Sequence, residues 1–450
     1  MASIKGFAQI DLIKGNIFKS IILFTLPLLV SYIFQQLYNA ADTVIIGRLL
    51  DENSLVAIGA CAALYELLTG FGIGFGNGLS IVAARAYGAG NYESLKKITA
   101  ASFFITFGVT IFIMVICQIW LKPMMILLKT PAEHLEEAYS YISVITFFCG
   151  VLFAYNLFAG MLRAIGNSVV PLIFLIFSSI LNVILDIIFI KQTGGIKGAA
   201  IATVLSQFVS ALLCLIYIFF KAKILVPSAR HFLPDKKLYK DLIGQGLSMA
   251  LMGSIVHTGT VILQTAINSL DAMIIAGHLC ARKVFSLTNI PVVTLGFSVS
   301  TFVSQNFGAN QIERIKKGVK IAIFITGIWT LILILPARFV VVPLIKFMTG
   351  SQNQTIIDYA SKYIFFTIPF YLVLGGLLIT RNALQGLGKK LLPLISSLIE
   401  FLGKVFFTYL IIPRIGSWGV ILCEPLIWCA MLSQLLFVFI RLPIFRRKTV

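Results

Sequence analysis

Charged residues are scarce in this chain of 450 residues. Asp, Glu, Lys and Arg together make up 12% of the sequence, whereas soluble proteins carry about 25%. Hydrophobic residues account for 59%, and the mean hydropathy is +0.98. A water-soluble globule needs more polar surface than this composition supplies. The shortage of charge therefore excludes a soluble protein and favours one embedded in a membrane.

The sequence also lacks the motifs of metal, nucleotide and catalytic sites. Its seven cysteines form no CxxC pair and its four histidines show no metal-ligand spacing, which argues against a zinc site or a disulfide framework. Gly386–Lys390 comes closest to a phosphate-binding loop, but the leading Gly and the Ser or Thr after Lys389 are missing. There is no HExxH, no DxxD pair and no Ser-His-Asp candidate set. We therefore expect no cofactor, no catalytic residue and no enzymatic activity.

Twelve apolar runs are present, each about long enough to cross a bilayer as a helix of roughly 20 residues. The first run starts near Ile17, and no small-residue cleavage site follows it, so we interpret it as a membrane helix rather than a signal peptide. Continuous runs without two-residue alternation predict helices rather than a β-barrel. The predicted spans are 18–46, 56–83, 98–120, 137–162, 168–190, 197–220, 241–270, 277–304, 318–345, 355–381, 391–412 and 417–440.

The two halves of the sequence repeat each other. The segment from Gly88 to Lys97 matches the segment from Gly308 to Lys317 at five of ten positions, at an offset of 220. A second block repeats at an offset of 222, Leu162–Gly166 against Leu384–Gly388. Six spans per repeat give both copies one orientation, as in parallel repeats of transporters. We predict an N-terminal lobe (1–220), a linker (221–240) and a C-terminal lobe (241–450).

Positive charge gathers in the loops on one side of the predicted membrane. The linker and the connections after spans two, four, eight and ten are rich in Lys and Arg, as are both ends of the chain, including Arg446 and Arg447. Excess positive charge marks the cytoplasmic side, so we expect both termini and the linker in the cytoplasm. Because these charges lie in short loops beside helix ends, we expect a lipid bilayer and no nucleic acid as partner.

Without a nucleotide site, a duplicated helical membrane protein is expected to draw energy from an ion gradient. Asp42 and Asp186 are acids well inside predicted spans, where charged groups are expensive and mark functional sites. Gln35, Asn39 and Asp42 follow one another at steps of four and three residues, so they share a helix face. Asn182 and Asp186, four residues apart, share a face of the fifth span.

These side chains offer oxygen ligands for a small cation. Thr203, near the start of the sixth span, adds a hydroxyl to the carboxylates and the amide, and such hard donors suit Na⁺. The same carboxylates could instead carry a proton, because burial disfavours the charged form. Asp186 could also serve only in hydrogen bonds between helices. Gln35, Tyr38 and Asn39 are further candidates for a substrate cavity or a switch.

The second half does not repeat this set. At an offset of 222, Lys404 and Thr408 take the places of Asn182 and Asp186. Glu400 lies four residues before Lys404, which predicts a buried ion pair with a structural role or a role in handling substrate or protons. The candidates of this half for a substrate cavity or a switch are Glu400, Lys404 and Glu424.

In its spans, its repeat and its buried polar residues, the chain resembles the multidrug and toxic compound extrusion (MATE) family, within the superfamily of multidrug, oligosaccharidyl-lipid and polysaccharide exporters. The resemblance covers essentially the whole chain and depends on the order and spacing of its motifs. The segments that carry it are Asn39–Gly47, Ala86–Gly90, Arg163–Asn167, Asn182–Asp186, Gly195–Ala199 and Ser304–Ala309.

The resemblance implies where the coupling ion binds. Some prokaryotic members use an Asp in the first span with an Asn, an Asp and a Thr in spans five and six. That pattern falls here on Asp42, Asn182, Asp186 and Thr203, which would hold Na⁺ or H⁺. Another branch uses a Glu in span seven and an Asp in span ten. This sequence has no Glu between 242 and 270 and no Asp beyond the start of span ten, which favours the N-terminal site.

The resemblance further implies two six-helix lobes in a V around a central cavity, acting as a monomer in the plasma membrane. Lipophilic cationic compounds would leave the cell in exchange for Na⁺ or H⁺ by alternating access, in which the two ligands favour different conformations. A lipid-linked saccharide flippase of the same superfamily is the alternative, although such flippases tend to have extra helices. A channel is a further alternative, which saturable, gradient-driven flux would exclude.

Overall fold

The chain folds into long helices. A computed structural model describes residues 9–128, 130–350 and 352–442, without the side chains of residues 52 and 349. Within these ranges every regular element is a helix. Eleven helices there are long and apolar enough to cross a membrane, and a bent pair makes up a twelfth span. The prediction of an all-α multi-pass membrane protein is confirmed, while the basic tail with Arg446 and Arg447 lies outside the described residues.

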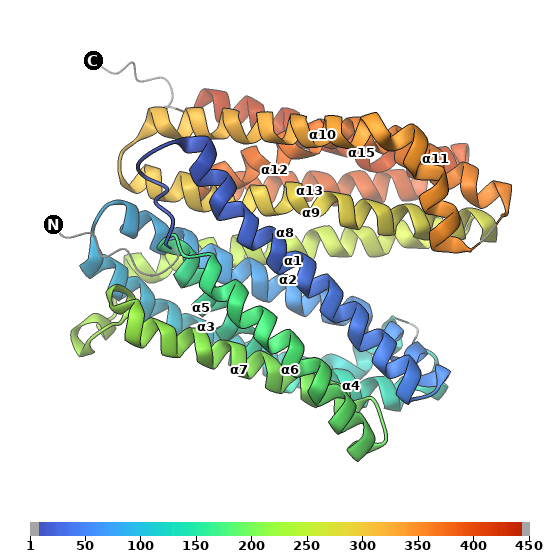
Figure 1. Ribbon diagram of the computed structural model, residues 1–450, viewed down its shortest axis with the longest axis horizontal. Coiled ribbons are helices and arrows are strands. Elements are labelled where there is room, and N and C mark those ends of the chain that lie inside the picture. The colour runs from blue at the N-terminus through green and yellow to red at the C-terminus, as the bar shows by residue number, and fades with distance from the viewer. Residues whose placement is uncertain (1–8, 129, 351, 443–450) are drawn as a thin grey trace. The chain divides into compact units, whose positions relative to one another are not determined.

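The helices agree with the predicted spans and extend most of them by several residues. Apolar stretches end before the helices do, because a helix can continue into the polar interface that flanks the hydrocarbon layer. The elements longer than ten residues, shown in Figure 1, are α1 (Ile17–Leu49), α2 (Glu52–Gly88), α3 (Tyr92–Leu127), α4 (Leu135–Phe147), α5 (Cys149–Ala164), α6 (Val169–Thr193), α7 (Lys197–Lys221), α8 (Lys236–Ile267), α9 (Ala272–Gly308), α10 (Ile312–Thr349), α11 (Gln354–Thr367), α12 (Tyr371–Gly386), α13 (Leu391–Phe406) and α15 (Ser417–Arg441).

Three of the predicted spans are interrupted. The fourth is divided into α4 and α5, which meet at an angle of 45° around Phe148. The tenth is divided by the 3₁₀ turn η4 (Ile368–Phe370), which contains Pro369, and proline is a common cause of kinks in helices. The eleventh contains the π-helical turn η5 (Phe407–Ile411) between α13 and the short α14 (Ile412–Ile415). By contrast, α1 runs without a break through Pro27.

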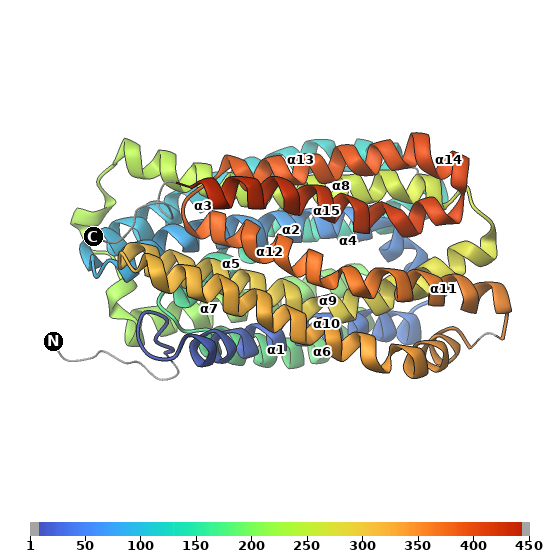
Figure 2. The same cartoon turned by 90° about the horizontal axis from the view of Figure 1, so that it is seen from above.

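Contacts divide the chain into two compact units. The first unit comprises Ile22–Leu251 and the segment that ends at Ile13, and the second comprises Lys14–Ile21 and the residues from Met252 onward. Two helices contribute to both, since α1 changes unit after Ile21 and α8 after Leu251. In each unit the helices run lengthwise beside one another (Figure 2). The linker carries two short 3₁₀ turns, η2 (Lys223–Leu225) and η3 (Ala229–Phe232).

A run of glycines brings three helices of the first unit into close contact. A Cβ atom at Gly78 would lie 2.5 Å from the backbone oxygen of Gln245, and one at Gly74 would lie 2.6 Å from that of Met249, both in α8. On another face of α2, a Cβ at Gly76 would lie 2.8 Å from the Asn156 oxygen in α5. Small residues allow this approach of backbones, so the run packs α2 closely against both α5 and α8.

The sequence repeat returns as a repeat of backbone conformation. Gly90 and Asn310, at an offset of 220, both adopt left-handed backbone (φ 68° and 57°). Gly166 and Gly388, at an offset of 222, do the same (φ 89° and 77°). Each turn ends a helix, and in both cases the positive φ reverses the chain so that orphan carbonyls of the last helical turn are satisfied. The duplicated blocks therefore encode two helix C-terminal turns, and each turn occurs once in each half of the chain.

Candidate functional site

Asp42, Asn182 and Asp186 come together inside the first unit. Asp42 lies on α1, and the other two lie one turn apart on α6, both fully buried. With its amide nitrogen turned toward the carboxylates, Asn182 donates to Asp42 Oδ1 at 2.8 Å and to Asp186 Oδ2 at 3.1 Å. Because the orientation of an amide is assigned from its hydrogen bonds, the opposite rotation would direct three oxygen atoms at one point.

The two carboxyl groups also contact each other directly. Among the described residues neither Asp42 nor Asp186 forms an ion pair, and Asp186 Oδ1 is buried without a hydrogen-bond partner. Two like charges in contact inside an apolar helix bundle are stable only with a proton or a cation between them. The donor set of carboxylates with an amide suits a small hard cation such as Na⁺, and it suits a proton equally well.

Hydroxyl groups extend this cluster toward α7. Tyr38 lies one turn before Asp42 on α1 and donates a hydrogen bond to Thr203 Oγ1 at 3.2 Å. The Tyr38 phenol also contacts the Asp42 carboxylate, so it links that carboxylate to the buried Thr203 hydroxyl. The four residues predicted to hold the coupling ion are thus connected through Tyr38, which the sequence suggested only for a substrate cavity or switch.

Gln35 and Asn39 do not join the cluster. Each shares a helix face with Asp42, as predicted, but in the described part of the chain neither side chain bonds to a member of the cluster. Asn39 is exposed, whereas Gln35 is half-buried. A shared helix face places side chains near one another, and the position of the neighbouring helices decides which of them meet α6 and α7.

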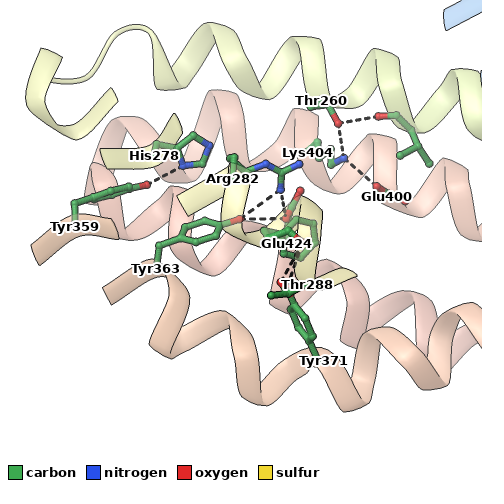
Figure 3. A network of polar contacts seen from close by, with 12 residues as sticks. Thr260, His278, Arg282, Thr288, Tyr359, Tyr363, Tyr371, Glu400, Lys404 and Glu424 are labelled. Atoms are coloured by element: carbon green, nitrogen blue, oxygen red, sulfur yellow. Dashed lines mark hydrogen bonds and ion pairs between the residues drawn. The ribbon is translucent and has the colours of Figure 1, made fainter. Parts of the chain in front are cut away.

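The second unit contains the predicted Glu400–Lys404 pair. Lys404 Nζ donates to Glu400 Oε1 and to Thr260 Oγ1, both at 2.9 Å (Figure 3). The side chains of Lys404 and Glu400 are only 3% and 11% exposed. Thr260 belongs to α8, so the pair fixes α13 against that helix. Removing either charge would leave the other buried and uncompensated.

Glu424 has partners that were not predicted from the sequence. Arg282 Nη1 on α9 donates to Glu424 Oε2 at 2.7 Å, and the Tyr363 hydroxyl on α11 donates to the same oxygen at 3.3 Å. A further contact joins His278 Nδ1 and the Tyr359 hydroxyl at 3.2 Å (Figure 3). Arg282 is the sixth residue of the predicted span 277–304, so the rule that marks charges inside membrane helices would have found it.

Comparison with known proteins is consistent with this fold. The sequence profile of the MatE family matches residues 27–188 and again residues 248–410. The second match is offset from the first by 221 at its start and by 222 at its end, which confirms the internal repeat. The chain therefore belongs to the multidrug and toxic compound extrusion (MATE) family. It is a membrane transporter of that family and not an enzyme.

Several curated proteins are similar over most of their length. The chain is 27% identical to the probable multidrug resistance protein YoeA of Bacillus subtilis (strain 168), over 87% of this chain and 86% of that protein. It is 23% identical to the multidrug export protein MepA of Staphylococcus saprophyticus, with 95% of each chain covered.

Solved structures share the fold at low sequence identity. A multidrug resistance MATE family transporter in an outward-facing conformation matches with a TM-score of 0.87 and 22% identity, over 99% of this chain and 100% of that one. A transporter of the superfamily from Pyrococcus furiosus matches with a TM-score of 0.86 and 21% identity, over 97% and 98% of the two chains.

Proposed function

We propose that this protein exports lipophilic cationic compounds in exchange for Na⁺ or H⁺ by alternating access. The observation that carries the proposal is the contact of Asp42 and Asp186 around Asn182, without a basic partner among the described residues. Relatives named for multidrug resistance and export support small compounds as substrates rather than the lipid-linked saccharides of the alternative function.

The coupling cation would bind between α1, α6 and α7. Asp42, Asn182, Asp186 and Thr203 would hold it, and the Asn182 amide offers a simple device for doing so. With its nitrogen toward the carboxylates the amide serves the cation-free cluster, and with its oxygen toward them it becomes a ligand. A Na⁺ ion or a proton shifts a conformational equilibrium only by its difference in affinity for the two states. A helix α1 that carries Asp42 away from α6 in one state would supply that difference.

The oligomeric state, the membrane and the orientation of the protein are also part of the proposed function. We propose that the protein works as a monomer in the plasma membrane with both termini in the cytoplasm, because Lys and Arg gather in the loops on that predicted side. Substrates entering from the cytoplasm would leave on the other face, driven by inward movement of the coupling ion.

Substitution of the two carboxylates tests the coupling role. Asp42→Asn and Asp186→Asn keep the size of each side chain but remove its charge. We expect ethidium efflux from cells and from proteoliposomes to fall to the level of vesicles without protein in both variants. Na⁺ and pH gradients imposed separately on the wild-type protein identify the coupling ion. Asp358→Asn is the matched control, because Asp358 is exposed on α11 and its side chain accepts a hydrogen bond from neighbouring Gln354. Efflux at the wild-type rate in both carboxylate variants would refute the assignment.

A further inference from the structure

Arg282 is held in the second unit by groups of the kind that bind organic cations. Its guanidinium donates to the Glu424 carboxylate at 2.7 Å and to the Tyr363 hydroxyl at 3.5 Å. Its Cζ atom also lies 4.8 Å from the centre of the Phe285 ring, one turn further along α9. Figure 3 shows the carboxylate and the phenol beside Arg282. Together with the aromatic face of Phe285 they surround one positive charge and make a cation–π site.

The aromatic part of this site is fixed in place by its neighbours. Phe285 stacks on Trp428 of α15, with ring centres 5.8 Å apart and planes at 16°. It meets Tyr371 of α12 edge to face at 5.7 Å, and the Tyr371 hydroxyl is 2.6 Å from Thr288 Oγ1. We call Phe285, Tyr363, Glu424 and Trp428 the cation cage. Its rigid rings and single buried carboxylate resemble a small-molecule site, in which apolar walls carry a few placed polar groups.

Arg282 is more exposed than the carboxylate that holds it. The Arg282 side chain is 32% exposed, whereas that of Glu424 is 10% exposed. The Arg282 side chain is therefore partly open to its surroundings, while the Glu424 carboxylate lies in the interior. Without Arg282, Glu424 would be a buried charge that has lost its hydrogen-bonded cation, which is unfavourable. A cationic ligand that replaced Arg282 would remove this cost, because one positive charge takes the place of another.

The second ion pair of this unit shows what a fixed structural pair looks like. Lys404 is 3% exposed and is bonded on two sides, to Glu400 and to Thr260. No ring in the described residues lies over its ammonium group at cation–π distance, as Phe285 does over Arg282. Lys404 has no open side through which it could leave, so exchange is specific to Arg282.

We propose that Arg282 is a tethered cation that occupies a binding site for lipophilic organic cations, formed by the cation cage. A cationic compound displaces the guanidinium from Glu424 and inserts an alkyl or aryl part against Phe285 and Trp428. This inference extends the proposed function, because it assigns to the second unit a site for the substrates that the function requires. The exchange makes and breaks ionic contacts only and involves no covalent step.

Equilibrium binding to purified protein in nanodiscs tests this inference without any ion gradient. Tetraphenylphosphonium is the probe, because it is a lipophilic cation that cannot donate hydrogen bonds. In Arg282→Gln the tethered competitor is gone, so the dissociation constant is expected to fall roughly tenfold or more, as the loss of one competing charged hydrogen bond predicts. Glu424→Gln is expected to weaken binding by a similar factor, alone or combined with Arg282→Gln.

Lys283→Gln is the matched control. Lys283 is exposed, lies next to Arg282 on α9 and carries the same charge, but it lies outside the cage. Equal tightening in Arg282→Gln and Lys283→Gln would overturn the proposal, since it would report a general loss of positive charge. Unchanged or weaker binding in Arg282→Gln would overturn it as well.

The wild-type protein offers a measurement that needs no variant. Phenylglyoxal modifies accessible arginines, and peptide mass spectrometry reads the rate at each one. Saturating tetraphenylphosphonium is expected to raise the rate of modification at Arg282, because the displaced guanidinium becomes accessible. An unchanged or slower rate would refute displacement. Because no gradient is present, these results stand apart from the efflux assays: failure of coupling at Asp42 would leave the binding result intact, and the reverse also holds.

Discussion

The first unit gathers two carboxylates around one amide, whereas the second unit sets each of its buried carboxylates against a cation. Asp42 and Asp186 have no basic partner among the described residues, while Glu400 pairs with Lys404 and Glu424 with Arg282. Duplication has preserved the helices and their turns but not the charges. Under the two proposals above, the first unit would take up a cation without releasing one of its own, whereas the second would exchange Arg282 for a ligand.

The two units differ in charge at equivalent positions of the repeat. At an offset of 222, Lys404 stands in α13 where Asn182 stands in α6, and Thr408 stands where Asp186 stands. Thr408 lies in the π turn η5, and its buried hydroxyl has no partner among the described residues. At the same offset Glu400 stands where Ser178 stands in α6, so at least three positions separate a carboxylate cluster without a basic partner in the described chain from an internal ion pair.

The largest expected effect comes from breaking the internal ion pair. Lys404→Met leaves Glu400 buried without its cation, and we expect the free energy of unfolding to fall by about 3–5 kcal/mol. The measurement is unfolding in mixed detergent micelles, followed by circular dichroism. The double variant Glu400→Leu with Lys404→Met removes both charges and is expected to recover most of the loss. A double variant as unstable as the single one would contradict the idea that charge imbalance is the cause.

The corresponding change in the first unit is expected to have the opposite sign. Asp186→Asn removes one of two carboxyl groups that contact each other, so repulsion and desolvation are relieved. We expect the free energy of unfolding to rise by about 1–2 kcal/mol in the absence of coupling ions, measured in the same way. The comparison between the units would fail if Asp186→Asn destabilised the protein as strongly as Lys404→Met does.

Much of this architecture could be predicted from the sequence. The membrane spans could be predicted because each needs a long apolar run. The residues Asp42, Asn182 and Asp186 could be selected as candidates because acids inside spans are few and energetically costly. The repeat could be read from two short blocks, Gly88–Lys97 and Leu162–Gly166, because they encode backbone turns that accept few residues.

Contacts between distant helices could not be predicted in the same way. Arg282 and Glu424 are 142 residues apart on α9 and α15, and their pairing depends on how those helices are rotated, which one sequence does not specify. For the same reason the shared face of Gln35, Asn39 and Asp42 did not reveal that only Asp42 reaches α6. The break at Phe148 has no proline and no glycine at the joint itself, so the apolar run gave no sign of it.

The smallest expected effects compare one buried hydroxyl in each unit. Tyr371→Phe removes a hydroxyl that lies 2.6 Å from Thr288 Oγ1 in a tyrosine that is 1% exposed, and we expect a loss of about 1 kcal/mol in unfolding free energy. Tyr38→Phe removes the weaker bond to Thr203 at 3.2 Å from a half-buried tyrosine, so its cost should be smaller, about 0.5 kcal/mol.

The two variants should rank in the opposite order for efflux: the one with the smaller loss of stability should have the larger effect on transport. Tyr38 links Asp42 to Thr203, and its loss should slow gradient-driven efflux, whereas Tyr371→Phe should leave the response to the ion gradient unchanged. If Tyr371→Phe altered that response more than Tyr38→Phe did, coupling would have to extend into the second unit, because the Tyr371 hydroxyl bonds to Thr288 and to the Phe285 carbonyl and not to the carboxylate cluster.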